Sequence, residues 1–89
     1  MEGESEMKIQ VLGPGCAKCR KTYEVVVDAL RQLGETAEVE KVDKIEEIMT
    51  FGVMMTPALV VNGRVKCSGK IPTVAEVTNY IATALAEAE

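Results

Sequence analysis

Gly-Pro-Gly-Cys-Ala-Lys-Cys-Arg, residues 13–20, places two thiols three positions apart, where an alternating strand pattern ends and a helical pattern begins. Side chains at this spacing lie on one face of a helix, about 5–6 Å apart at Cβ, which is close enough for a disulfide to open and close. Free N–H groups at a helix start stabilise a thiolate, and Lys18 adds a positive charge nearby. We therefore expect Cys16, beside Gly15, to be the exposed attacking sulfur and Cys19, one turn deeper, to be the resolving thiol. The alternative is a buried pair of small apolar side chains.

The segments around this motif predict the order strand–helix–strand–helix–strand–strand–helix. Strands are expected at residues 7–12, 36–42, 58–61 and 64–68, the second of them at an exposed edge because it carries several charges. Helices between the first three strands imply β-α-β crossovers, and the fourth strand returns as an antiparallel hairpin partner. The sequence therefore predicts an α/β domain with a four-stranded mixed sheet and three helices.

Several short signals mark the ends of these helices. Gly34 is well placed to end the first helix in a left-handed conformation. Asp43 with Glu46, and Thr73 with Glu76, both match the spacing of a capping box. We therefore expect Asp43 to cap the short second helix and Thr73 to cap the last one.

The Asn-Gly pair at residues 62–63 is the strongest short signal for a β-hairpin. In the strand that follows, alternation places Val65 and Cys67 on one apolar face. Cys67 could be a third redox or metal ligand, but free cysteine is among the most buried residue types, so we expect it to pack in the core. The Met54-Met55 pair could form an adaptable lip for substrates or could fill the core, and Tyr23 could line the rim of the site or belong to the core.

The composition limits the classes of function. The chain has 89 residues and a net charge of −4, so we expect one domain at residues 7–89 after a disordered tail at 1–6. Its basic residues form no patch interleaved with aromatics, which argues against nucleic-acid binding. Apolar runs are too short for a membrane helix, and because no basic region followed by an apolar stretch opens the sequence, we expect no secretory signal. Three cysteines, an odd number, favour the cytoplasm, where a CxxC pair is more often catalytic or metal-binding than structural.

The chain resembles the thioredoxin/glutaredoxin superfamily over residues 7–87, and most closely the small redox-active disulfide proteins. The resemblance rests on Cys16-Ala17-Lys18-Cys19 after the first strand, on Thr56-Pro57 before the third, and on the Asn-Gly hairpin. It implies a thioredoxin-like fold in which the proline is cis and faces the CxxC pair, while the backbone of Thr56 pairs with an extended substrate segment. A proline that merely starts a strand is the alternative.

The resemblance implies a thiol–disulfide oxidoreductase that acts on protein or small-molecule disulfides and is served by an upstream reductase. We expect a monomer without a cofactor. The chain departs from the family in lacking Trp, in having no carboxylate within residues 9–12 to act as a buried proton relay, and in its 67–70 segment, Cys-Ser-Gly-Lys, which lacks the residues that help glutaredoxins hold glutathione.

Two other classes use the same motif. A soft-metal module could bind Cu(I) or Zn through the CxxC thiolates. Copper-chaperone domains, however, run β-α-β-β-α-β, and a closed zinc site needs four ligands where this chain offers three Cys and no His. An iron–sulfur carrier formed by a dimer is the third possibility.

Overall fold

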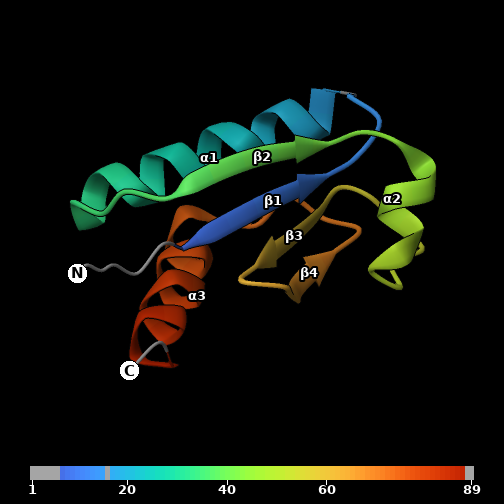
Figure 1. The fold of residues 1–89 in the computed structure, drawn as a ribbon. Helices are drawn as coiled ribbons and strands as arrows, with labels where there is room; N and C mark the ends of the chain where they lie inside the picture. The colour runs from blue at the N-terminus through green and yellow to red at the C-terminus, as the bar shows by residue number, and fades with distance from the viewer. Residues whose placement is uncertain (1–6, 16, 88–89) are drawn as a thin grey trace.

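The computed structural model describes residues 7–15 and 17–87. The expected tail at 1–6 and Cys16 lie outside the described residues. Figure 1 shows the predicted order of elements. These are β1 (Lys8–Leu12), α1 (Ala17–Leu33), β2 (Glu38–Val42), α2 (Ile45–Thr50), β3 (Ala58–Val61), β4 (Arg64–Ser68) and α3 (Val74–Glu87). Within residues 7–15 and 17–87, no helix combines the length and the apolar composition that crossing a membrane requires.

The sheet has the strand order β2-β1-β3-β4, with β1 parallel to β2 and antiparallel to β3. The prediction of a mixed four-stranded sheet with β2 at an edge is therefore confirmed. In this register Leu12 at the end of β1 lies beside Val42 at the end of β2 and beside Ala58 at the start of β3. The segments that follow β1 and β2 and the segment that precedes β3 consequently meet at one end of the sheet.

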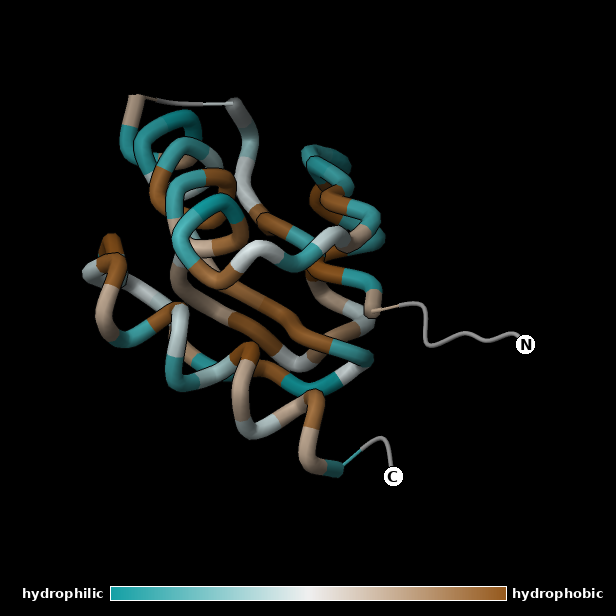
Figure 2. Tube along the Cα trace, turned by 90° about the vertical axis from the view of Figure 1, so that its left-hand side faces the viewer, coloured by the Kyte–Doolittle hydropathy of each residue, from teal (hydrophilic) through white to brown (hydrophobic). Residues whose placement is uncertain are grey.

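Helices cover both faces of the sheet. Helices α1 and α3 pack with one set of strand residues, including Ile9 and Leu59, while α2 contributes Ile48 to a second cluster around Leu12 and Val60. Strand β3 is therefore buried along its whole length, which explains why its sequence is continuously apolar rather than alternating. Figure 2 shows hydrophobic residues gathered between the helices and the sheet.

Two of the predicted helix ends are confirmed. Gly34 has a φ of +68°, and the N–H of Glu35 donates to the carbonyl of Leu30 at 3.0 Å, which closes the end of α1. At the start of α3, the Thr73 N–H donates to Glu76 Oε1 at 3.0 Å. The Glu76 N–H in turn donates to Thr73 Oγ1 at 3.1 Å, which completes the capping box.

The expected cap at Asp43 is wrong. Helix α2 begins at Ile45, and its N-cap is Lys44, which has an extended backbone and makes no side-chain capping hydrogen bond. Asp43 lies one position too early to reach the N–H groups of the first turn, because β2 continues to Val42 before the chain turns. The carboxylate of Asp43 therefore does not cap α2, the helix for which the sequence pattern predicted it as the cap.

The predicted hairpin is present, but the expected alternation beyond it is wrong. Both residues of the Asn62–Gly63 turn have positive φ values, 51° and 84°, as a two-residue hairpin turn of this kind requires. Val65 lies opposite Val60, whereas Cys67 lies opposite Leu59, because a bulge interrupts the ladder between these pairs. Val65 and Cys67 therefore lie on opposite faces of the sheet.

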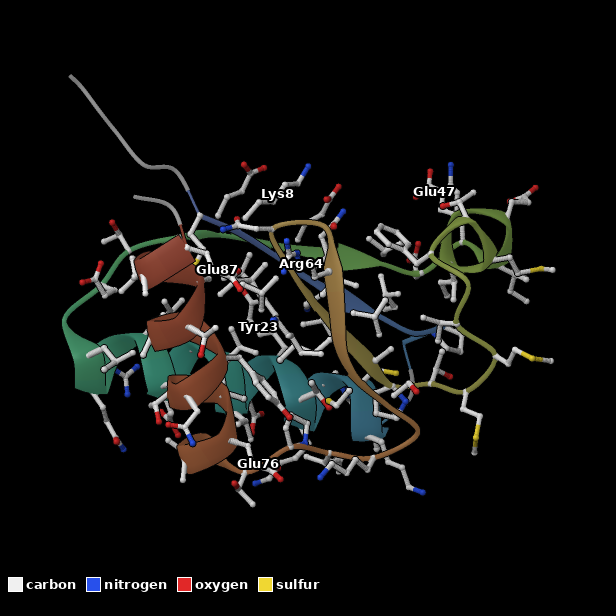
Figure 3. All side chains as sticks on the ribbon, turned by 90° about the horizontal axis from the view of Figure 1, so that it is seen from below. Lys8, Tyr23, Glu47, Arg64, Glu76 and Glu87 are labelled. Atoms are coloured by element: carbon white, nitrogen blue, oxygen red, sulfur yellow. The ribbon has the colours of Figure 1, made fainter. Side chains whose placement is uncertain are left out.

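The far end of the hairpin is joined to the last helix. Figure 3 labels Arg64 at the start of β4 and Glu87 at the end of α3, which form an ion pair of 3.4 Å between Nη1 and Oε2. Both side chains are largely exposed, so this pair adds little to stability. It lies away from the end of the sheet where the candidate site is found.

Candidate functional site

Cys19 is the residue around which the candidate site is built. It is the third residue of α1, and only 6% of it is exposed, whereas its helix neighbours Lys18 and Arg20 are exposed. The expected burial of Cys19 is therefore confirmed. Cys16, its expected partner, lies outside the described residues and precedes the first residue of α1 in the sequence.

Gly13 is held against Cys19 so closely that no larger residue fits. A Cβ atom built on Gly13 would overlap Cys19 Sγ, and would lie 3.2 Å from Cys19 Cβ and 3.8 Å from Thr56 Cβ. Gly13 itself is buried, and its N–H donates to the carbonyl of Val42 at 2.9 Å, which extends the pairing of β1 with β2 by one residue. The missing side chain of Gly13 thus lets Cys19 and Thr56 approach the end of β1.

Gly13 belongs to the site, although the sequence motif assigned it no role of its own. The signal that could have identified it is its position, directly after a strand and six residues before a cysteine that faces that strand. A glycine inside or next to a strand often marks a close approach of another group. The identity of that group depends on how α1 packs on the sheet, which local sequence does not specify.

Thr56 and Pro57 lie on the β3 side of Cys19. The Thr56–Pro57 peptide bond is cis, as the resemblance implied. Pro57 is buried, Thr56 is exposed, and the carbonyl of Pro57 accepts a hydrogen bond of 2.8 Å from the N–H of Gly69 after β4. Pro57 is therefore tied to the segment that follows β4, while Thr56 is exposed at the surface.

A hollow of about 200 Å³ lies on the other flank of Cys19. It is formed where β1, β2 and the start of α1 meet, and the residues that line it do not include Thr56 or Pro57. The lining residues are Val11, Gly13, Gly15, Cys19, Arg20, Lys41 and Asp43. The hollow therefore brings two cationic side chains and one carboxylate next to the buried sulfur.

The other predicted site residues have clear positions. Gly15 is exposed with a φ of +92°, a backbone conformation that favours glycine, and it lines the hollow. The side chain of Lys18 is exposed, and its carbonyl accepts a hydrogen bond of 2.9 Å from Oγ1 of the fully buried Thr22. Tyr23 packs partly against the core, and Lys41 Nζ lies 4.6 Å from the centre of its ring.

The two methionines before Thr56 are exposed rather than buried. Met54 is 97% exposed and Met55 is 63% exposed, so the alternative in which they fill the core is wrong. A Cβ atom on Gly69 would lie 3.3 Å from Met55, which shows that Met55 rests against the loop that holds Pro57. These flexible apolar side chains flank Thr56 on the surface.

Cys67 is only partly buried, and it packs against the core rather than within it as predicted. It lies on the face covered by α1 and α3 and is packed against that cluster. Burial raises the pKa of the Cys67 thiol, which disfavours the reactive thiolate form. Cys67 therefore does not have the environment of an attacking sulfur.

Comparison with known proteins agrees with this arrangement. Residues 7–82 match the family model of a thioredoxin domain. A thioredoxin of Methanothermobacter thermautotrophicus is 33% identical over 75 residues, which cover 84% of this chain and 97% of that protein. A thioredoxin of Methanocaldococcus jannaschii is 41% identical over 69 residues, which cover 78% of this chain and 79% of that protein.

The chain belongs to the thioredoxin-domain family. The observed order of elements, with three helices and a final helix α3, is the predicted thioredoxin-like one. It differs from the β-α-β-β-α-β order of copper-chaperone domains, so the resemblance of the CxxC motif to those domains does not extend to the fold.

Proposed function

We propose that this protein is a thiol–disulfide oxidoreductase that cycles Cys16 and Cys19 between a dithiol and a disulfide. Membership of the thioredoxin family supports this general class of activity. The observation that carries the proposal is the position of Cys19, buried at the first turn of α1 and packed against Gly13 beside Thr56. A second thiol three residues earlier in the sequence gives Cys19 a partner at disulfide spacing.

In the proposed reaction, the Cys16 thiolate attacks one sulfur of a substrate disulfide. A mixed disulfide forms, and the first half of the substrate leaves as a thiolate that takes a proton from solvent. Cys19 then attacks Cys16 Sγ, the second half of the substrate leaves, and the Cys16–Cys19 disulfide forms. The substrate gains two electrons and the two cysteines lose two, so an upstream reductase must return the pair to the dithiol.

The neighbouring residues have supporting roles in this proposal. Free N–H groups at the start of α1 and the charge of Lys18 favour the thiolate of Cys16. Gly15 leaves the approach to Cys16 open, since it has no side chain and is exposed. Thr56 presents its backbone to an extended substrate segment, and Pro57 fixes the loop that carries it.

The substrates in this proposal are protein disulfides or small-molecule disulfides. The exposed Met54 and Met55 favour substrates with an apolar segment next to the reacting disulfide, because methionine adapts its shape to different partners. A protein substrate would contact Thr56 and these methionines at the same time.

Insulin disulfide reduction, followed with dithiothreitol as the electron donor, tests the proposal. The wild-type protein is expected to accelerate the reaction, Cys16→Ser to abolish the acceleration, and Cys67→Ser to retain it. Cys67→Ser is the matched control because it removes the same atom from a packed thiol outside the motif. Full activity of Cys16→Ser would contradict the proposed function.

A further inference from the structure

The buried position of Cys19 raises the question of where its proton goes. To attack the mixed disulfide, Cys19 must become a thiolate, yet it is only 6% exposed. Strand β1 offers no carboxylate at residues 9–12 to take the proton. Gly13, which lies against Cys19, and Thr56, which lies near Gly13, carry no titratable side chain.

Among the described residues that line the hollow on the β2 flank of Cys19, one has a side chain that can accept a proton. Arg20 and Lys41 line it as cations, which offer donors and no acceptor. Asp43 is the one carboxylate among the described residues that line the hollow. The charged groups that face Cys19 across the hollow are therefore Arg20 from α1, and Lys41 and Asp43 from β2 and the segment after it.

The position of Asp43 is set by the sheet rather than by a helix. Val42, its neighbour, pairs with Leu12 and accepts a hydrogen bond from the N–H of Gly13 at 2.9 Å. Asp43 therefore lies beside Gly13, the residue that is closest to Cys19 Sγ at the end of β1. No side chain caps α2, so the carboxylate of Asp43 does not make a capping hydrogen bond to the helix that follows.

Water can connect the two groups. A hollow of about 200 Å³ has room for several water molecules, since one needs only about 10–15 Å³ of such space. The lining of the hollow is mostly apolar, and Arg20, Lys41 and Asp43 bring the charged groups with which water can form hydrogen bonds. Lys41 is steadied by its contact with the ring of Tyr23, 4.6 Å away.

We propose that Asp43 accepts the proton of Cys19 through water held in this hollow. The inference rests on the proposed function. As the Cys19 S–H bond breaks, its proton passes through water to the carboxylate of Asp43, and the freed sulfur electron pair attacks Cys16 Sγ. The bond between Cys16 and the substrate sulfur breaks, that sulfur leaves as a thiolate, and Asp43 later returns its proton to solvent.

Single-turnover kinetics can separate this step from the first attack. The reduced protein is mixed with a chromogenic aromatic disulfide, so that formation of the mixed disulfide releases one thiol and resolution by Cys19 releases a second. In Asp43→Asn we expect the first release at the wild-type rate. The second release should slow by about 10- to 100-fold, at or below the lower limit of the range for general acid–base groups, because water that remains in the hollow can still accept the proton.

Rescue by formate distinguishes proton transfer from a structural role of Asp43, because added formate can replace a missing proton acceptor but cannot repair a change in structure. Formate is a small carboxylate that fits a hollow of about 200 Å³, so adding it at constant ionic strength should restore the second step in Asp43→Asn and leave the wild type unchanged. Asp43→Glu should keep a rate close to that of the wild type. Glu46→Gln, which removes an exposed carboxylate from α2, is the matched control and should leave both steps unaltered.

The possible outcomes are distinct. A second step at the wild-type rate in Asp43→Asn, or a slow second step that formate does not accelerate, would overturn the role of Asp43. Either result leaves the proposed function intact as long as Cys16→Ser abolishes both thiol releases. If Cys16→Ser still releases both thiols, the proposed function itself fails.

Discussion

Replacement of Gly13 by alanine tests the contact on which the site depends. The added methyl group would overlap Cys19 Sγ and lie 3.2 Å from Cys19 Cβ, so α1 must shift away from the end of β1 or Cys19 must rotate. Overpacking of this kind costs about 1–3 kcal/mol. The loss of backbone freedom in the unfolded chain offsets about 0.4–1 kcal/mol of that, because the φ of Gly13 is not in the left-handed region. We therefore expect a net loss of roughly 1–2 kcal/mol of unfolding free energy.

Urea denaturation under reducing conditions measures this loss of unfolding free energy. The same substitution made in the Cys19→Ala variant identifies its cause. In Cys19→Ala the sulfur that the new methyl group would overlap is gone, so Gly13→Ala should then cost little or even stabilise the protein. The double-mutant cycle should give a coupling energy of about 1–3 kcal/mol, which is the overpacking cost alone. An equal cost of Gly13→Ala in both backgrounds would refute the assigned contact between Gly13 and Cys19.

Three further predictions concern other parts of the chain. Hydrogen bonds from Thr73 and Lys70 lower the pKa of Glu76, so its carboxylate favours folding above the unfolded pKa and loses this effect as the pH falls through the folded pKa. The urea midpoint of wild type relative to Glu76→Gln should therefore be constant above about pH 5 and decline below it, whereas no pH dependence would contradict the assignment. Burial raises the pKa of the Cys67 thiol, so its alkylation at neutral pH should be much slower in the folded protein than in urea. The Cys16→Ser/Cys19→Ser variant, in which Cys67 is the remaining cysteine, allows both rates to be measured. Equal rates would contradict this prediction. Met54→Ser should change the free energy of unfolding by less than about 0.5 kcal/mol, because Met54 is 97% exposed. The same substitution should raise the KM for a protein disulfide. An unchanged KM would show that the Met54 side chain does not contact the substrate.

The fold was predictable because its strongest signals are local. The capping box at Thr73, the left-handed Gly34 and the Asn62–Gly63 turn each depend on residues within one short segment, and each is present in the structure. The continuous apolar run of β3 also indicated its central, two-sided burial. Local interactions of this kind do not depend on the packing of distant elements.

The errors arose where one residue of register decides the result. Asp43 matches a capping-box pattern, but pairing of β2 with β1 extends the strand to Val42 and moves the helix cap to Lys44. A bulge in the hairpin likewise separates Val65 from Cys67, although simple alternation places them together. A shift of one position reverses the side of a strand on which a side chain lies.

The sequence predicted the residues of the candidate site but not their surroundings. The CxxC motif and Thr56–Pro57 were recognisable in the sequence, and the described parts of both lie at one end of the sheet. The close approach of Gly13 to Cys19 depends on how α1 packs on the sheet, and the hollow that contains Asp43 depends on the pairing of β2 with β1. Local sequence does not specify either arrangement.

Trapping of the covalent intermediate tests the central claim most directly. The Cys19→Ser variant, incubated with a disulfide substrate and analysed by mass spectrometry after proteolysis, should carry one substrate half joined to Cys16 and none joined to Cys67. The adduct should be released by dithiothreitol. An adduct at Cys67, or no adduct at all under conditions in which the wild-type protein turns over, would contradict the account.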